Sequence, residues 1–167
     1  MSEHALDLLT SEITACRRCP RLVEWRERVA VEKRASFISD DYWGKPVPGW
    51  GDPRAALVVV GLAPAAHGAN RTGRMFTGDR SGDWLYRALH EAGFANQPES
   101  TGRQDGLVLS NAWVTAPVRC APPENRPATA ERDNCSEWFH RELDLLEDAR
   151  VFVALGQYGY LAVWRYL

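Results

Sequence analysis

The sequence predicts an α/β protein with an open, mostly parallel central sheet flanked by helices. Three short apolar runs have the composition of buried parallel strands: residues 55–60, residues 106–109 extended to 111, and residues 151–155. Each run is followed by a loop that contains Gly or Pro. Helical patterns lie between the runs, and strands that alternate with helices form parallel sheets.

The chain before the first strand is predicted to form two helical pieces and a loop. The first helix is expected to have Thr10 or Ser11 as its cap and to run toward Cys16. A helical pattern of apolar residues continues over residues 22–29. Residues 42–53 hold three Gly, three Pro and three aromatic residues, a composition typical of an ordered loop.

Two helices are predicted between the strands and one after them. The first runs from Ser81, its expected N-cap, to Gly93, which ends it. The second covers residues 129–146. Residues 157–167 form the last helix, which is apolar almost all round, so we expect it to leave apolar surface uncovered.

Size and composition indicate one ordinary globular domain over residues 1–167. The chain has a mass of 18.8 kDa and a formal net charge of −2. Neither a signal peptide nor an apolar run of membrane-spanning length is visible, which predicts a cytoplasmic protein. Of the 20 basic residues 18 are Arg, which suits phosphate binding but also follows from a GC-rich genome.

Two loops at the predicted carboxyl ends of the strands hold the unusual residues, and ligands bind at such ends in open parallel sheets. Residues 61–79 form a Gly-rich loop that is neither a P-loop nor a dinucleotide fingerprint. It suggests a pocket for a small molecule or a base. In residues 118–127, prolines stiffen the backbone around Asn125, whose amide matches a pyrimidine edge. The alternative is a turn Asn that satisfies its own backbone.

The four cysteines indicate a metal site. Cys16 and Cys19 form a C-x-x-C pair, while Cys120 and Cys135 are separated by fourteen residues. Zinc sites usually pair two short-spaced knuckles, whereas iron–sulphur clusters tolerate irregular spacing. The spacing leaves the metal's identity open, and four buried apolar cysteines are the remaining alternative.

Three motifs together resemble the iron–sulphur uracil-DNA glycosylases, in the family 5 (type B) branch rather than family 4. They are residues 16–22 (CRRCPRL), the loop of residues 61–79 (GLAPAAHGANRTGRMFTGD), and residues 118–127 (VRCAPPENRP). The likeness extends over essentially the whole chain. It implies a three-layer glycosylase fold and base-excision repair of DNA, single- or double-stranded, that contains uracil, hypoxanthine or some modified pyrimidines. The expected location is cytoplasmic, on nucleoid DNA.

The resemblance also implies roles for individual residues. Asp79 would serve the catalytic water, Phe76 would stack on the extruded base and Asn125 would contact that base and take part in catalysis. The implied [4Fe–4S] ligands are Cys16, Cys19, Cys120 and Cys135, with zinc as the alternative. We further expect Ala63 and His67 on the base and Arg71 and Arg74 on the DNA backbone. The residues alone permit a helix cap at Asp79 and a core position for Phe76.

The sequence departs from the family at its end. The family has a fourth strand and a His-containing loop beyond the segment that matches residues 157–167, so we expect this domain to lack them. The activity of this form is then in question, and a catalytically impaired DNA-binding module or a zinc-bound structural protein are the other hypotheses. We expect a monomer at full length and a dimer through the last helix otherwise.

Overall fold

The structure is a computed structural model that describes residues 2–167. Its centre is a four-stranded sheet in the order β1-β3-β2-β4. Strand β2 pairs in parallel with both β3 and β4, and β1 pairs antiparallel with β3. This confirms the predicted open, mostly parallel sheet. The strands are β1 Trp50–Gly51, β2 Leu57–Val60, β3 Ala112–Thr115 and β4 Val151–Ala154.

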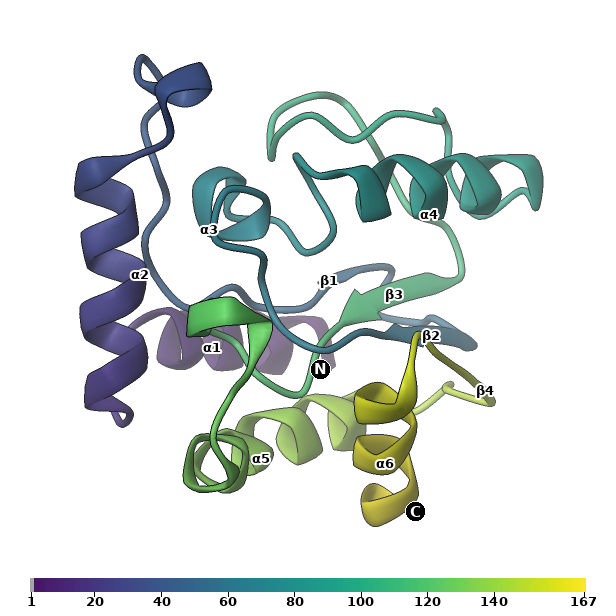
Figure 1. The fold of residues 1–167 in the computed structure, drawn as a ribbon. Helices are drawn as coiled ribbons and strands as arrows, with labels where there is room; N and C mark the ends of the chain where they lie inside the picture. The colour runs from purple at the N-terminus through teal and green to yellow at the C-terminus, as the bar shows by residue number, and fades with distance from the viewer. Residues whose placement is uncertain (1) are drawn as a thin grey trace.

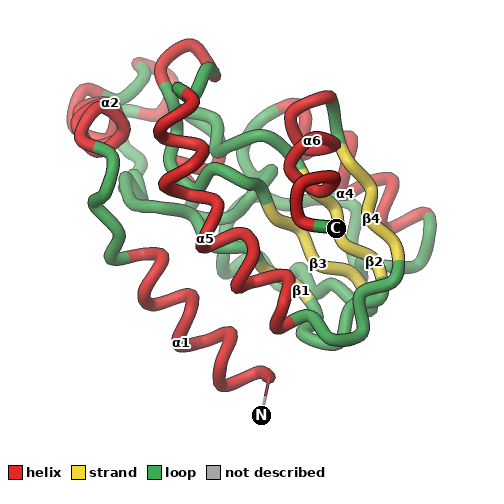
Figure 2. The backbone as a smooth tube through the Cα atoms, turned by 90° about the horizontal axis from the view of Figure 1, so that it is seen from below, coloured by secondary structure: helices red, strands yellow, loops and turns green. Residues whose placement is uncertain are grey.

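Helices cover both faces of this sheet, which gives three layers (Figure 1). Helices α3 and α4 lie on one face, and α5 and α6 lie on the other. Helix α1 packs along α5, as Figure 2 shows, and α2 stands at the side of the sheet. The helices are α1 Ser2–Thr14, α2 Pro20–Glu32, α3 Ala69–Thr72, α4 Arg80–Glu91, α5 Thr129–Leu145 and α6 Gln157–Tyr166, with short 3-10 turns η1 Ala35–Phe37 and η2 Pro123–Asn125.

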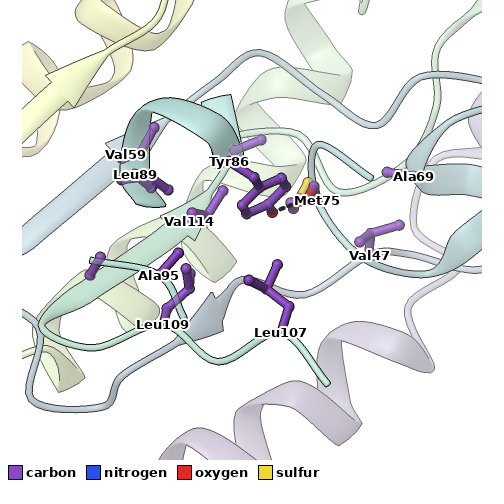
Figure 3. Close-up of a cluster of buried hydrophobic side chains, with 12 residues drawn as sticks. Val47, Val59, Ala69, Met75, Tyr86, Leu89, Ala95, Leu107, Leu109 and Val114 are labelled. Carbon is purple, nitrogen blue, oxygen red and sulfur yellow. Dashed lines mark hydrogen bonds between the residues drawn. The ribbon is translucent and has the colours of Figure 1, made fainter. Parts of the chain in front are cut away.

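The two faces of β2 supply two separate cores, because successive strand side chains point to opposite faces. Val58 and Val60 pack with the α5 and α6 layer, while Val59 packs under α4. Figure 3 shows the second of these clusters, in which the Tyr86 hydroxyl donates to the Met75 carbonyl at 2.6 Å. All of β3 is buried, as a strand covered on both faces must be.

The second predicted strand was wrong in its position. The strand is Ala112–Thr115, and residues 106–111 form a loop that returns to α4's end through a bridge between Ala95 and Leu109. Leu107 and Leu109 are buried beneath α4, so their apolar character reflects the core and not a strand. The left-handed φ of 57° at Asn111 ends this loop just before the sheet begins.

The observed ends of the other helices and strands lie closer to the predicted ones, except for the start of the first helix. Helix α1 begins at Ser2 and not at Thr10 or Ser11, because Leu6, Leu9 and Ile13 form one buried stripe at helical spacing. The short strand β1 lies inside the loop predicted for residues 42–53. Within residues 2–167, no helix is both long and apolar enough to cross a lipid bilayer.

Candidate active site and metal centre

A pocket of about 400 Å³ opens where β2 and β4 end, at the edge of the sheet where the sequence placed it. That volume is in the range of small-molecule sites, ~300–1,000 Å³. Four of the predicted residues line it, namely Ala63, Phe76, Asp79 and Asn125. The loop after β2 supplies three of them, and the segment after β3 supplies the fourth.

Asp79 lines this pocket and also caps α4. Its Oδ1 accepts a hydrogen bond from the Gly82 amide at 3.0 Å, which is the N-cap interaction. The cap is therefore Asp79 and not Ser81. A Cβ at Gly68 would lie 2.4 Å from Asp79 Oδ2, so only glycine allows the carboxylate to sit here. The position of Asp79 is compatible both with a helix cap and with a catalytic carboxylate.

Phe76 lies on the pocket wall in a strained backbone conformation. Its φ of 53° is uncommon for a residue with a bulky side chain. A Cβ at Gly61 would lie 2.5 Å from the ring, and one at Gly82 would lie 1.7 Å from the Phe76 carbonyl oxygen. Gly61 thus makes room for the ring at the end of β2, and Gly82 makes room for the backbone that carries it. The ring packs in part against the core and in part faces the pocket.

Asn125 is placed by the proline-rich segment after β3. It adopts a left-handed φ of 54°, which Asn tolerates better than most residues. Its backbone amide donates to the Pro122 carbonyl at 3.2 Å, whereas its side-chain amide has no hydrogen-bond partner within residues 2–167. The amide is therefore free to bind a ligand. Asn125 lines both the pocket and a groove beside it.

His67 lies in that neighbouring groove and does not line the pocket with Phe76, which differs from its expected contact with the base. Its Nδ1 is 2.8 Å from the Tyr42 hydroxyl, and the two rings meet edge to face. Burial, followed by the positive charges of Arg34 and Arg71, lowers the pKa of His67. The imidazole is thereby favoured in its neutral form.

The two arginines expected at the DNA backbone are engaged within the fold. Arg74 is buried and forms an ion pair with Asp105, with Nη2 and Oδ1 3.0 Å apart. Arg71 pairs with Asp40 at 2.8 Å and donates to the carbonyl oxygens of His67 and Gly78. Their positive charge organises the loop, and Arg74 in particular is placed in the core and not at a DNA surface.

Sequence reasoning missed several residues of this region. Ser81 and Leu155 line the pocket, and Arg34 and Arg80 line the groove. Tyr42 bonds His67 from the aromatic loop. Arg80 and Ser81 follow Asp79 at the start of α4, and that position was the available signal; Arg34, Tyr42 and Leu155 come from segments far apart in the chain.

The four cysteines line one cavity. Cys16 follows α1, Cys19 is the N-cap residue of α2, Cys120 lies in the loop after β3, and Cys135 lies in α5. All four are free thiols. Among residues 2–167, no group of three or more His, Cys, Asp or Glu side chains is arranged to hold a metal ion.

Three of the sulphurs accept hydrogen bonds from the surrounding chain. Buried Arg26 donates from Nη1 to Cys120 at 3.2 Å, the Arg119 amide donates to Cys135 at 3.4 Å, and Asn134 lies 3.7 Å from Cys19. Burial raises the pKa of Cys120 to about 11 and that of Cys135 to about 12, against the lowering effect of the arginines. Burial thus favours the neutral thiol at Cys120 and at Cys135.

Fold and pocket together define a class of protein. Members of this class have an open α/β sheet with a ligand pocket at the strand ends, and here an aromatic face, an amide and a carboxylate line that pocket. A family model described as the uracil DNA glycosylase superfamily matches residues 48–166.

Three relatives place the chain more narrowly. The type-5 uracil-DNA glycosylase of Mycobacterium tuberculosis (strain CDC 1551 / Oshkosh) is 58% identical over 158 residues, 94% of this chain and 59% of that protein. The type-5 enzyme of Pyrobaculum aerophilum is 48% identical over 96% of this chain and 70% of its own length. The type-4 enzyme of Sulfurisphaera tokodaii is 26% identical over 93% of this chain and 56% of its own.

The chain belongs to the uracil DNA glycosylase superfamily, in its type-5 branch. This confirms the resemblance to family 5 rather than family 4. The chain spans 59% of the length of the mycobacterial relative.

Proposed function

We propose that this chain excises uracil from DNA by hydrolysing the N-glycosidic bond. The observation that carries the proposal is the pocket in which Phe76, Asp79 and Asn125 meet at the carboxyl end of β2. An enzyme acting on a base must take it out of the stack and hold it in such a pocket, at a cost of a few kcal/mol. The Phe76 ring provides a face for the extruded base, and stacking of this kind contributes ~1–3 kcal/mol.

Asp79 is the group that supports bond cleavage. The reaction develops positive charge on the sugar and negative charge on the leaving base. The Asp79 carboxylate stabilises the sugar cation and orients the attacking water. The Gly82 amide and the close approach of Gly68 hold it in place, so little reorganisation is needed during the reaction.

Asn125 reads the edge of the base. A carboxamide carries a donor and an acceptor side by side, which matches the adjacent N–H and C=O of uracil. Hypoxanthine presents the same pair, so we include it, with modified pyrimidines, among the substrates. Neither of the chain's two lysines, Lys33 and Lys45, lines the pocket, which supports a hydrolase that leaves the DNA strand intact.

The test is release of free base from DNA by this chain. Duplex and single-stranded oligonucleotides carrying one uracil or one hypoxanthine are incubated with excess protein, and the abasic product is measured after alkaline cleavage. We expect uracil release from both forms. Binding without release would favour a DNA-binding module that lacks the chemistry, and absence of both would overturn the proposal.

We further propose a [4Fe–4S] cluster on Cys16, Cys19, Cys120 and Cys135. The chemistry of the cavity supports it: four thiols surround one space, and N–H donors point at three of the sulphurs. When bound, the cluster would supply a rigid link between the start of α2 and the segment that carries Asn125. The residues around it fix Cys120 and Cys135 on either side of that segment.

Metal analysis tests this second proposal. Protein purified without oxygen is expected to be brown, with roughly four iron and four sulphide per chain. Cys135→Ser should lose most of the colour, while Ser136→Ala, a matched change at the next residue, should keep it. Stoichiometric zinc without iron, after growth with ample iron, would contradict the cluster and favour a structural zinc site.

A further inference from the structure

A groove adjoins the base pocket and shares three residues with it, namely Ala65, Asp79 and Asn125. A nucleotide whose base fills the pocket has its sugar at this shared rim, beside Asp79. The phosphates on either side of that sugar must then leave along the groove. The inference below rests on the proposed function, because it concerns the substrate's backbone.

Two arginines give this groove positive charge that no carboxylate neutralises directly. Arg34 and Arg80 both line it, and both side chains are exposed. Neither forms an ion pair with any residue in the described range 2–167. The carboxylates of Asp79 and Glu124 also line the groove, so an anion bound there is drawn to the arginines and repelled by these two groups.

Hydrogen bonds around Tyr42 favour one of the two neutral tautomers of His67. The Arg34 amide donates to the Tyr42 oxygen at 3.3 Å. The Tyr42 hydroxyl lies 2.8 Å from His67 Nδ1, and in the arrangement where it donates its one proton to that nitrogen, Nδ1 is the acceptor. In a neutral imidazole the other nitrogen must carry the hydrogen. In that arrangement His67 Nε2 is an N–H donor, and it has no hydrogen-bond partner in residues 2–167.

His67 is also held rigidly by its backbone. Arg71 donates from Nε to the His67 carbonyl at 2.7 Å and from Nη2 to the Gly78 carbonyl at 3.1 Å. The same guanidinium lies over the Phe37 ring, with its central carbon 3.9 Å from the ring centroid. Arg71 therefore fixes the main chain of His67, and Tyr42 fixes its side chain. Such double support is expected of a group that binds a ligand.

We propose that Arg34, His67 and Arg80 form a subsite for a phosphodiester that flanks the extruded nucleotide, with Tyr42 fixing His67 as the tautomer that donates from Nε2. The positive charges of Arg34 and Arg80 attract the phosphate, and the neutral N–H of His67 orients it through a hydrogen bond. Tyr42 acts through His67 and is a positioning residue.

The tautomer is tested by NMR on protein labelled with ¹⁵N-histidine at pH 7. His67 is assigned by comparison with His67→Gln. We expect Nε2 to carry the proton in the parent protein and the Nδ1-protonated form to rise in Tyr42→Phe. A His67 that is charged at pH 7, or a tautomer unchanged in Tyr42→Phe, would overturn the role of Tyr42.

The phosphodiester is tested with a duplex that carries a non-hydrolysable 2′-fluoro-deoxyuridine. A neutral methylphosphonate replaces the linkage 5′ or 3′ to it, and Kd is measured by fluorescence anisotropy. We expect one of the two replacements to weaken binding about 10-fold. His67→Ala should lose that discrimination, and His67→Gln, which keeps a donor at the same position, should retain most of it. Arg54→Ala, at an exposed position in the turn before β2, is the matched control and should discriminate normally.

The salt dependence of DNA binding distinguishes the roles of Arg34 and Arg80 from that of the neutral His67. The slope of log Kd against log salt should fall by about 1 in Arg34→Ala and in Arg80→Ala, because each releases about one counterion on binding. His67→Ala should weaken binding with an unchanged slope. Competition by inorganic phosphate at constant ionic strength distinguishes a general anion site from one that requires DNA; we expect weak competition only.

Failure of this inference and of the proposed function are distinguishable. If the parent protein releases uracil but all three variants keep the parent's response to methylphosphonate, the subsite is wrong and the activity stands. If the parent releases no uracil and binds no DNA, both fail.

Discussion

At the scale of single residues, Asp79 both caps a helix and lines the candidate active site. Its Oδ1 accepts from the first turn of α4, and its side chain lines the pocket. A helix cap contributes about 1 kcal/mol, and a carboxylate that acts on the reacting bond contributes more. Substitutions that keep the cap and remove the charge can therefore separate the two.

We expect Asp79→Ala to lower single-turnover uracil release by about 10²-fold or more and to lower the free energy of unfolding by about 1 kcal/mol. Asp79→Asn should lose as much activity with little loss of stability, because Asn is an equally good N-cap. Single-turnover excision and urea denaturation measure the two effects. Near-normal excision by Asp79→Asn would show that Asp79 is only a cap.

Phe76→Leu should mainly weaken capture of the extruded base. Loss of stacking is expected to raise the Kd for the non-hydrolysable duplex by about 10-fold, toward the lower part of the ~1–3 kcal/mol range. Phe94→Leu, a partly buried Phe packed on the same core, is the matched control. Equal binding losses in the two variants would indicate a packing effect in place of stacking.

The candidate site could be predicted in part from its residues. Phe76, Asp79 and Asn125 stand in motifs whose glycines and prolines indicate a built loop, and all three line the pocket. The burial of Arg74 in an ion pair could not be predicted, because its partner Asp105 is 31 positions away and lies in no recognisable motif. The expected missing strand and His loop stay a prediction.

At the scale of elements, buried ion pairs fix the loops on the sheet. Arg119 binds both carboxylate oxygens of Glu142, which also accepts from the Gly49 amide and the Thr115 hydroxyl. This network joins the loop before β1, the end of β3 and α5. Strand and helix types could be predicted from apolar periodicity, but the position of β3 could not, because residues 106–109 and 112–115 are both largely apolar and both contribute buried side chains.

The Arg74–Asp105 pair should make stability depend on pH in the acid range. Burial alone would raise the pKa of Asp105, but hydrogen bonds from Arg74 and from the amides of Leu107 and Thr101 outweigh it and lower the pKa to about 2. The ion pair thus contributes its full stabilisation of the folded state above the ordinary pKa of 3.8. That stabilisation is lost as the pH falls through about 2.

We expect the difference in unfolding free energy between the parent protein and Asp105→Asn to shrink by about 2 kcal/mol between pH 5 and pH 2. Urea denaturation across that range measures it. Asp148→Asn, which removes an exposed carboxylate beyond α5, is the control. A difference that does not change with pH would contradict the assigned pair.

At the scale of the whole molecule, one face is apolar and open. Strand β4 is the edge of the sheet, and α6 presents Tyr160 and Trp164 in a stacked pair at 6.4 Å. Trp164 is 69% exposed. The sequence predicted this uncovered surface from the apolar last helix. Other exposed large apolar residues of β4 and α6 are Leu161 and the pair Val151 and Val153, which alternate with Phe152 and point to the α4 side of the sheet.

We expect this chain to self-associate through that face, because exposed apolar patches and open sheet edges favour it. Light scattering should give a mass that rises with concentration. Trp164→Lys should lower that mass, whereas Trp84→Lys, which replaces an exposed Trp on α4, should not. A monomer at all concentrations would contradict the prediction.

The cysteine cavity joins residues from both ends of the chain, and this affects how the protein is made. Cys19 leaves the ribosome 116 residues before Cys135 (135 − 19). At ~5–20 residues per second, Cys19 waits roughly 6–23 s for Cys135. During translation the Cys19 thiol is open to oxidants, because the four-cysteine cavity can be completed only once α5 has been synthesised.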